Sequence, residues 1–213
     1  MIPNVISLGG VARVGKDTFC LEIINLLQAR GIEAQRIAFA DELKKDLKDF
    51  LLAKTGVNVY TDDDGEKAII RPLLVEYGKL MRSISNGQYW INKLKPLIKN
   101  NTSSGVISII TDVRYPNEVE WVNSIKNSIS IHIIRNGIIY ANEEERDQDP
   151  PTQALAQSVI NWENCLPEEI ESQARKHIYE KILLNKTDRP RSGEVSESFK
   201  ESRRSIEGTF PAP

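Results

Sequence analysis

The segment that begins at Gly10 has residue types and a spacing suited to binding phosphate. Gly10, Gly15 and Lys16 complete the pattern G-x-x-x-x-G-K, with an apolar run before it and a helical pattern after it. The glycines let the backbone turn N–H groups inward, and the helix N-terminus adds partial positive charge. Lys16 would reach the β- and γ-phosphates, and Thr18 would add a hydroxyl. The alternative, a turn with an incidental lysine, is less consistent with the flanking strand and helix.

Two acidic residues near this loop are candidate magnesium ligands. Asp17 stands where the pattern usually has Ser or Thr, and a carboxylate is also a hard oxygen ligand. Asp17 could instead only complement the helix dipole, but a negative charge beside phosphates favours a cation between them. Asp112 ends an apolar run, and ligands of open parallel sheets bind beyond the carboxyl ends of the strands. It would hold Mg²⁺ through water, meet a second substrate, or cap the helix that begins at Pro116.

Three arginines are candidates for a second phosphate site. Arg71 and Arg82 stand 11 residues apart, which on a helix returns to within roughly 20° of the same face. Two such side chains can clamp a phosphate, although a solvated helix face is the alternative. Arg114 follows Asp112 by two residues, so it would place a cation at the same sheet edge unless it forms a surface ion pair.

Short apolar runs alternate with helical patterns along the chain, which predicts an α/β fold with a mostly parallel sheet covered on both faces. The predicted strands cover about 5–8, 36–39, 106–111, 129–134 and 158–160. The predicted helices cover about 16–30, 41–51, 88–99, 116–125 and 167–184. Asp41 is a candidate N-cap, and Arg71-Pro72 is expected to open a further helix. Residues 136–157 are polar and ambiguous.

Composition limits the function classes. The chain has 213 residues, 28 basic and 30 acidic, for a net charge of −2, with 40% hydrophobic residues. These values exclude wholesale disorder and argue against a broad surface that coats nucleic acid. Two cysteines and two histidines exclude a thiolate-rich zinc site, so metal ligands would be carboxylates. We expect one domain over 1–184 and a mobile tail over 185–213. No signal peptide or membrane span is evident, so we expect a soluble, cytoplasmic protein.

Several segments together resemble the deoxynucleoside monophosphate kinases of tailed bacteriophages. Gly15-Lys16-Asp17-Thr18 with Arg13 inside the loop is similar to the family's phosphate loop. The stretch 39–44, the helix 71–82 with Tyr77-Gly78, Trp90 and the segment 112–118 are similar to further family segments, so the resemblance covers about residues 1–184. It implies a three-layer α/β/α P-loop kinase fold with a mostly parallel five-stranded sheet. It also implies a helical acceptor-binding insertion over about 41–100 and a short lid over about 135–153.

The resemblance implies ATP and Mg²⁺ as cofactors and the reaction dNMP + ATP = dNDP + ADP. The residues expected to bind ATP are Gly10, Arg13, Gly15, Lys16, Asp17, Thr18 and Asn164. Those expected to bind the acceptor are Asp41, Lys44, Arg71, Arg82, Trp90, Asp112 and Arg114, with Trp90 stacking on the base. Lys16, Arg13, Arg135 and Arg146 are the expected catalytic cations, and Asp17 and Asp112 the expected metal ligands. Asp41 and Asn164 could instead act only as helix caps, and Trp90 could instead belong to the core, as such aromatic residues more often do.

The lid departs from the family. Pro150-Pro151-Thr152-Gln153 stands where the family has an H-P-S-E-like stretch, so the histidine and the acid are both absent. Two other functions remain open: a kinase that phosphorylates a hydroxymethylated pyrimidine within DNA, as similar phage kinases do, and a nucleotide-binding interaction module without turnover. We expect a small-molecule partner and no membrane or nucleic-acid partner, while a homodimer is compatible with the sequence. A phage-encoded protein would act in the host cytoplasm.

Overall fold

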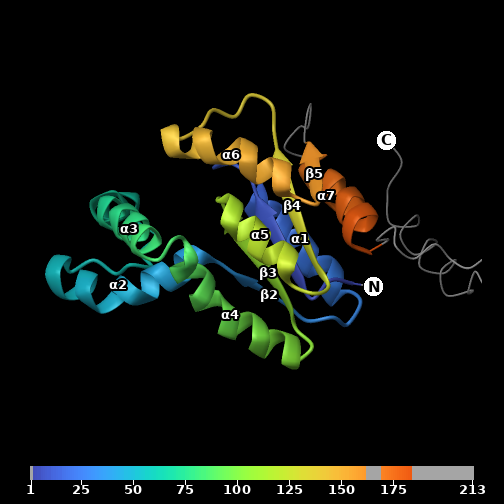
Figure 1. Cartoon of the computed structure of the whole chain (residues 1–213), viewed down its shortest axis with the longest axis horizontal. Helices are drawn as coiled ribbons and strands as arrows, with labels where there is room; N and C mark the ends of the chain where they lie inside the picture. The colour runs from blue at the N-terminus through green and yellow to red at the C-terminus, as the bar shows by residue number, and fades with distance from the viewer. Residues whose placement is uncertain (1, 162–168, 184–213) are drawn as a thin grey trace, which may run out of the picture.

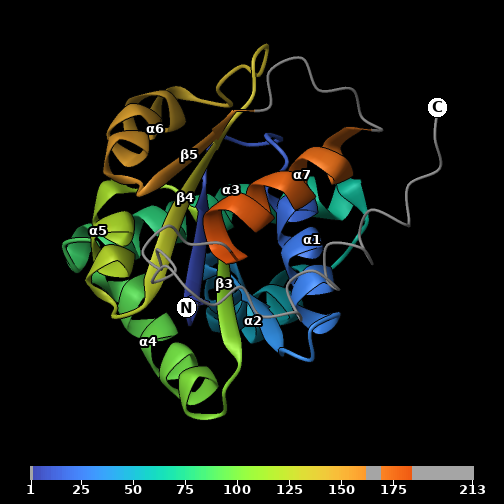
Figure 2. The same cartoon turned by 90° about the vertical axis from the view of Figure 1, so that its right-hand side faces the viewer.

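A five-stranded parallel sheet forms the centre of the computed structural model, which describes residues 2–161 and 169–183 (Figure 2). The strand order is β2-β3-β1-β4-β5, and every neighbouring pair is parallel. The strands are β1 (Val5–Gly9), β2 (Ala34–Ile37), β3 (Ile107–Val113), β4 (Ser128–Ile134) and β5 (Ser158–Asn161). This confirms the predicted α/β class. It also brings the carboxyl ends of β1, β3 and β4 to one edge.

Helices cover both faces of this sheet, as the near-continuous apolar strands require. On one face, α1 (Lys16–Gln28) and α7 (Ile170–Ile178), which continues as a π-helical turn (Tyr179–Leu183), pack against alternate residues of the strands. On the other face lie α4 (Gln88–Ser103) and α5 (Pro116–Ser124), and α6 (Glu143–Leu155) packs beside α5. Figures 1 and 2 show this arrangement, which confirms the three-layer prediction.

Two helices extend beyond the sheet at one end of the molecule (Figure 1). They are α2 (Phe39–Thr55) and α3 (Asp64–Ile84), and they share a small apolar cluster around Leu51 and Ile70. The carboxylate of Asp46 on α2 ties this part to α3 and α4. It accepts hydrogen bonds from the hydroxyls of Tyr77 (3.3 Å) and Tyr89 (2.8 Å) and from Lys93 Nζ (2.7 Å). These bonds lower the pKa of Asp46 against the effect of its burial.

The structure corrects the predicted start of one helix. Arg71-Pro72 does not open a helix, because α3 begins earlier and Pro72 lies inside it. The reason is the N-cap Asp63, whose Oδ1 accepts a hydrogen bond of 2.8 Å from the backbone N–H of Glu66. The ambiguous segment 136–157 contains a capped helix as well, since Asn142 Oδ1 accepts from the N–H of Glu145 at the start of α6.

Among residues 2–161 and 169–183, no helix combines the length and the apolar character needed to cross a bilayer. Asn164 and the proposed tail lie outside the residues that the structure describes.

Candidate functional site

The loop between β1 and α1 has a backbone that only glycine suits at its first position. Gly10 has φ +123°, and a Cβ there would lie 2.3 Å from the backbone oxygen of Ile133 on β4. Gly15 has φ +101° and is the N-cap of α1. Arg13 also has a positive φ, of 65°. Three such residues within six positions make a tight turn that passes close to β4.

Lys16 lies inside this loop. It is 9% exposed, and its Nζ donates hydrogen bonds of 2.7 Å to the backbone oxygens of both Gly10 and Val11. Burial, together with the charge of Arg114, lowers the Lys16 pKa to about 8. The carboxylates of Glu145, Asp17 and Asp112 act on that pKa in the opposite direction. Lys16 thus has charged neighbours from the first turn of α1, from the end of β3 and the residue just beyond it, and from α6.

Asp112, at the end of β3, caps a helix from a distance. Its Oδ1 accepts a hydrogen bond of 2.9 Å from the N–H of Phe39, and its Oδ2 accepts one of 2.8 Å from the N–H of Ala40. These are the first two amides of α2, so Asp112 caps this helix, and the suggestion that it caps the helix at Pro116 is wrong. The suggestion that Asp41 is the N-cap of its helix is also wrong, because α2 begins two residues before Asp41. Burial raises the Asp112 pKa despite the two amides and Arg114.

Glu118 on α5 holds the arginine-bearing part of the site together. Glu118 is 2% exposed, and its Oε2 accepts hydrogen bonds from the backbone N–H groups of Arg114 (2.9 Å) and Tyr115 (3.2 Å). Its Oε1 lies 3.3 Å from Nη2 of Arg82, whose guanidinium carbon is 3.6 Å from the centre of the Tyr115 ring. Burial raises the Glu118 pKa to about 7, against the charge of Arg82. The bond between Glu118 and Tyr115 shows the three-residue spacing typical of capping boxes, a signal present in the sequence.

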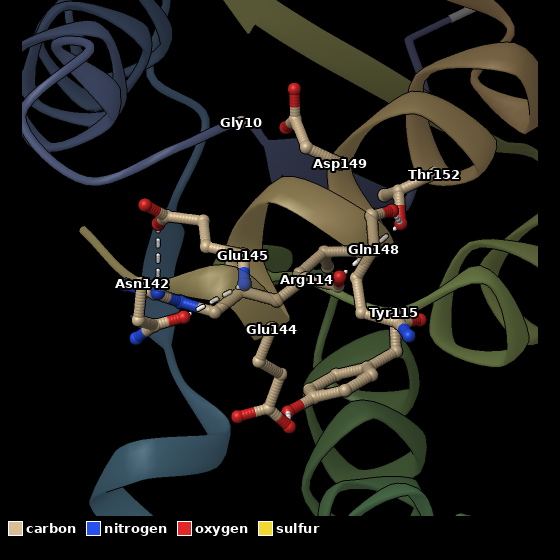
Figure 3. Close-up of a pocket in the computed structure, with 10 residues that line it drawn as sticks. Gly10, Arg114, Tyr115, Asn142, Glu144, Glu145, Gln148, Asp149 and Thr152 are labelled. Carbon is tan, nitrogen blue, oxygen red and sulfur yellow. Dashed lines mark hydrogen bonds and ion pairs between the residues drawn. The ribbon is translucent and has the colours of Figure 1, made fainter. Parts of the chain in front are cut away.

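Helix α6 covers the end of β3 and the loop, and a pocket lies between them (Figure 3). The residues that line it come from the loop, the β3–α5 turn and α6: Gly10, Val113, Arg114, Tyr115, Asn142, Glu144, Glu145, Gln148, Asp149 and Thr152. Glu145 Oε1 accepts from the N–H of Ala12 (2.8 Å) and lies 3.1 Å from Arg114 Nη1. Glu145 was not predicted, because its contact with Ala12 joins residues 133 positions apart.

The remaining predicted site residues differ in whether their side chains are exposed or have a partner within the fold. Arg13, Asp17, Thr18 and Arg71 are exposed, and Arg135 follows β4 directly. In two cases the side chain has a partner within the fold: Asp41 pairs with Arg36 (2.8 Å), and the Lys44 ammonium lies 5.8 Å from the Tyr60 ring centre.

Two predicted roles need separate comment. Trp90 is 2% exposed, donates to the Gly78 oxygen and meets Tyr77 and Tyr89 edge-on, so it belongs to the core and the prediction that it stacks on a base is wrong. The Arg146 side chain is 58% exposed, and its guanidinium lies near carboxylates of its own helix. It is the neighbouring Glu145, an acid, that contacts the loop.

Comparisons with known proteins give a likeness in fold only. No family model matches the chain, and no curated protein matches it. Similar solved structures include a dephospho-CoA kinase from Campylobacter jejuni, with 14% identity and a TM-score of 0.45 over 84% of this chain and 98% of that one. A shikimate kinase from Bacteroides thetaiotaomicron is also 14% identical, with a TM-score of 0.43 over 82% of this chain and 96% of that one. At these values the likeness adds nothing to what the chain's own loop and sheet show.

Proposed function

We propose that this chain transfers the γ-phosphoryl group of ATP to a deoxynucleoside 5′-monophosphate. The observation that carries the proposal is that one carboxylate oxygen, Glu145 Oε1, lies 2.8 Å from the backbone nitrogen of Ala12 in the loop and 3.1 Å from Arg114 Nη1. A phosphate-binding loop and a cation suited to a second phosphate are thereby close together at one sheet edge. The choice of a deoxynucleoside monophosphate as acceptor rests on the sequence resemblance of residues 13–18 and 112–118.

On the donor side, the loop amides and Lys16 would bind the ATP phosphates. Magnesium suits the donor set near Lys16, since Asp17, Thr18 and Asp112 all carry hard oxygen atoms and both acids are electrostatic neighbours of that lysine. Bound Mg²⁺ would neutralise charge on the phosphates.

On the acceptor side, Arg82 and Arg114 would hold the monophosphate, joined by Arg71 from the exposed flank of α3. Glu118 fixes the Arg82 guanidinium against Tyr115, so this cation is oriented before any ligand arrives. An acceptor phosphate is already anionic, so no general base is required. Arg13 and Arg135 are the further cations proposed for the transferring group, and catalysis would consist of positioning and electrostatic stabilisation.

The proposal is tested by ADP release from Mg-ATP with each of dAMP, dGMP, dCMP, dTMP and dUMP. One or a few of these are expected to stimulate release, and Lys16→Ala to lower the rate by about 10²–10³-fold, the range typical for loss of one charge-stabilising group. Lys99→Ala, at an exposed position on α4, is the matched control and should keep the wild-type rate. No stimulation by any monophosphate, with ATP binding intact, would reject the monophosphate acceptor and direct the assay to hydroxymethylated DNA.

A further inference from the structure

The side chain of Glu145 is buried against the phosphate loop although it belongs to a helix far along the chain. It is 6% exposed and has three partners. Oε1 accepts from the N–H of Ala12 at 2.8 Å and lies 3.1 Å from Arg114 Nη1, while Oε2 accepts from the N–H of Ala141 at 2.8 Å. A carboxylate therefore lies on a loop amide and on a guanidinium, which are the kinds of donor that bind phosphate oxygens.

Helix capping explains only part of this arrangement. Asn142 accepts from the N–H of Glu145, and Glu145 accepts from the N–H of Ala141, so the two side chains together cap the start of α6. That cap needs neither Ala12 nor Arg114. The bond to Ala12 leaves the Glu145 carboxylate where anions would meet the edge of the loop.

We propose that Glu145 is an internal occupant of a phosphoryl-binding position formed by the Ala12 amide and the Arg114 guanidinium, and that an incoming phosphoryl group displaces it. This inference rests on the proposed function, because it takes the loop to bind nucleotide phosphates. The same two donors serve the carboxylate in the free protein and a phosphate oxygen in the complex. Like charges at hydrogen-bond distance repel, so carboxylate and phosphate cannot share these donors.

Displacement of Glu145 has a structural consequence for α6. The distal part of this helix is anchored, since Asn123 Nδ2 donates to the Leu155 oxygen (2.9 Å). The Thr152 hydroxyl, whose shorter bond is to the Gln148 oxygen of the same helix (2.6 Å), also lies 3.2 Å from the Arg114 oxygen. The start of the helix is held to the loop by Glu145 and to the β3–α5 turn by Glu144, which accepts from the hydroxyl of Tyr115 (2.6 Å). Release of the Glu145 carboxylate removes the first of these contacts and its bond to the N–H of Ala141. Residues 141–147 therefore loosen while the distal end stays in place, and phosphate occupancy at the loop is coupled to the mobility of this segment.

Calorimetric binding of the Mg²⁺ complex of a non-hydrolysable β,γ-imido ATP tests the proposal. Glu145→Gln should bind it about tenfold more tightly than wild type, equivalent to about 1.4 kcal/mol. The matched control is Glu143→Gln, which removes the same charge from the same turn of α6 at a side chain that is 88% exposed, and its affinity should stay within about twofold of wild type. Equal or weaker binding by Glu145→Gln than by Glu143→Gln overturns the proposal.

Hydrogen exchange on the wild-type protein gives a second test that needs no variant. Addition of the same ligand should slow exchange in residues 10–16 and accelerate it in residues 141–147. Slower or unchanged exchange in 141–147 on a protein that binds the ligand overturns the displacement and leaves the proposed function intact. If neither wild type nor variants bind the ligand, the proposed function fails and the displacement with it.

Discussion

Replacing Gly10 by alanine should destabilise the loop between β1 and α1 for two separate reasons. The first is backbone strain, because φ at Gly10 is +123°, a region that costs a residue with a Cβ about 1–3 kcal/mol. The second is a collision, because the new Cβ would lie 2.3 Å from the Ile133 oxygen. That atom belongs to the backbone of β4 and cannot rotate away, so relief requires the loop or the strand to move.

The magnitude follows from adding the two causes. Overpacking of a tight site costs about 1–3 kcal/mol, so Gly10→Ala should lower the free energy of unfolding by about 2–6 kcal/mol. Gly31→Ala is the matched control, since Gly31 has φ +70° but no atom within 4 Å of the added Cβ. It should cost only the strain of a left-handed backbone, about 1–2 kcal/mol.

Urea denaturation of the three proteins measures this difference, and calorimetry with Mg-ADP measures the state of the loop. We expect Gly10→Ala to be less stable than Gly31→Ala and to bind Mg-ADP at least about tenfold more weakly than wild type, a loss of about 1.4 kcal/mol. Gly31→Ala should bind as wild type does. If Gly10→Ala matches Gly31→Ala in both stability and binding, the loop does not pass β4 as closely as the structure has it.

Three further predictions concern charged groups. Burial raises the pKa of Glu118 from 4.5 to about 7, so the folded state retains a proton that the unfolded chain has lost. The free energy of unfolding should therefore fall as pH rises from about 4.5 through 7. Urea titrations of Glu118→Gln should lack this part of the fall, and the same dependence on pH in the variant and the wild type would contradict the prediction. Lys16 has a pKa of about 8, so calorimetry should show pyrophosphate binding to wild type weakening as pH rises through that value, while Lys16→Ala shows no such step. Asp46→Ala removes the acceptor of two tyrosine hydroxyls and a lysine and should cost about 2–3 kcal/mol in urea denaturation; a loss below about 0.5 kcal/mol would mean that solvent replaces these bonds.

The parts of the fold that the sequence predicts well are local or continuous. A parallel sheet covered on both faces requires runs of apolar residues, and the runs before Gly10 and before Asp112 are of this kind. The loop between β1 and α1 is also local, because its glycines, its lysine and the following helix are contiguous. The sequence does not predict the start of α3, although Asp63 is a good N-cap, because proline at the first turn of a helix is the stronger local signal.

The parts that could not be predicted depend on long-range contacts. The Asp112 carboxylate caps a helix that begins 73 residues earlier, and nothing in the residues around Asp112 indicates this. The role of Trp90 also depends on long-range contacts. An aromatic residue on a helix is compatible both with a core position and with a base-stacking position. Only the neighbouring Tyr77 and Tyr89, brought together by the packing of α3 and α4, decide for the core.

The pairing of charges at this site bears on what it can bind. Two of the cations already have a buried carboxylate partner: Arg82 lies 3.3 Å from Glu118 and Arg114 lies 3.1 Å from Glu145. A cation that already has a buried carboxylate partner gains little from one weak anion such as chloride. In the displacement proposed above, a ligand with several phosphate charges replaces the Glu145 carboxylate, while Glu118 keeps its contact with Arg82. Under the proposed function, these carboxylates would favour polyphosphate ligands over simple anions and would keep the arginines oriented until such a ligand binds.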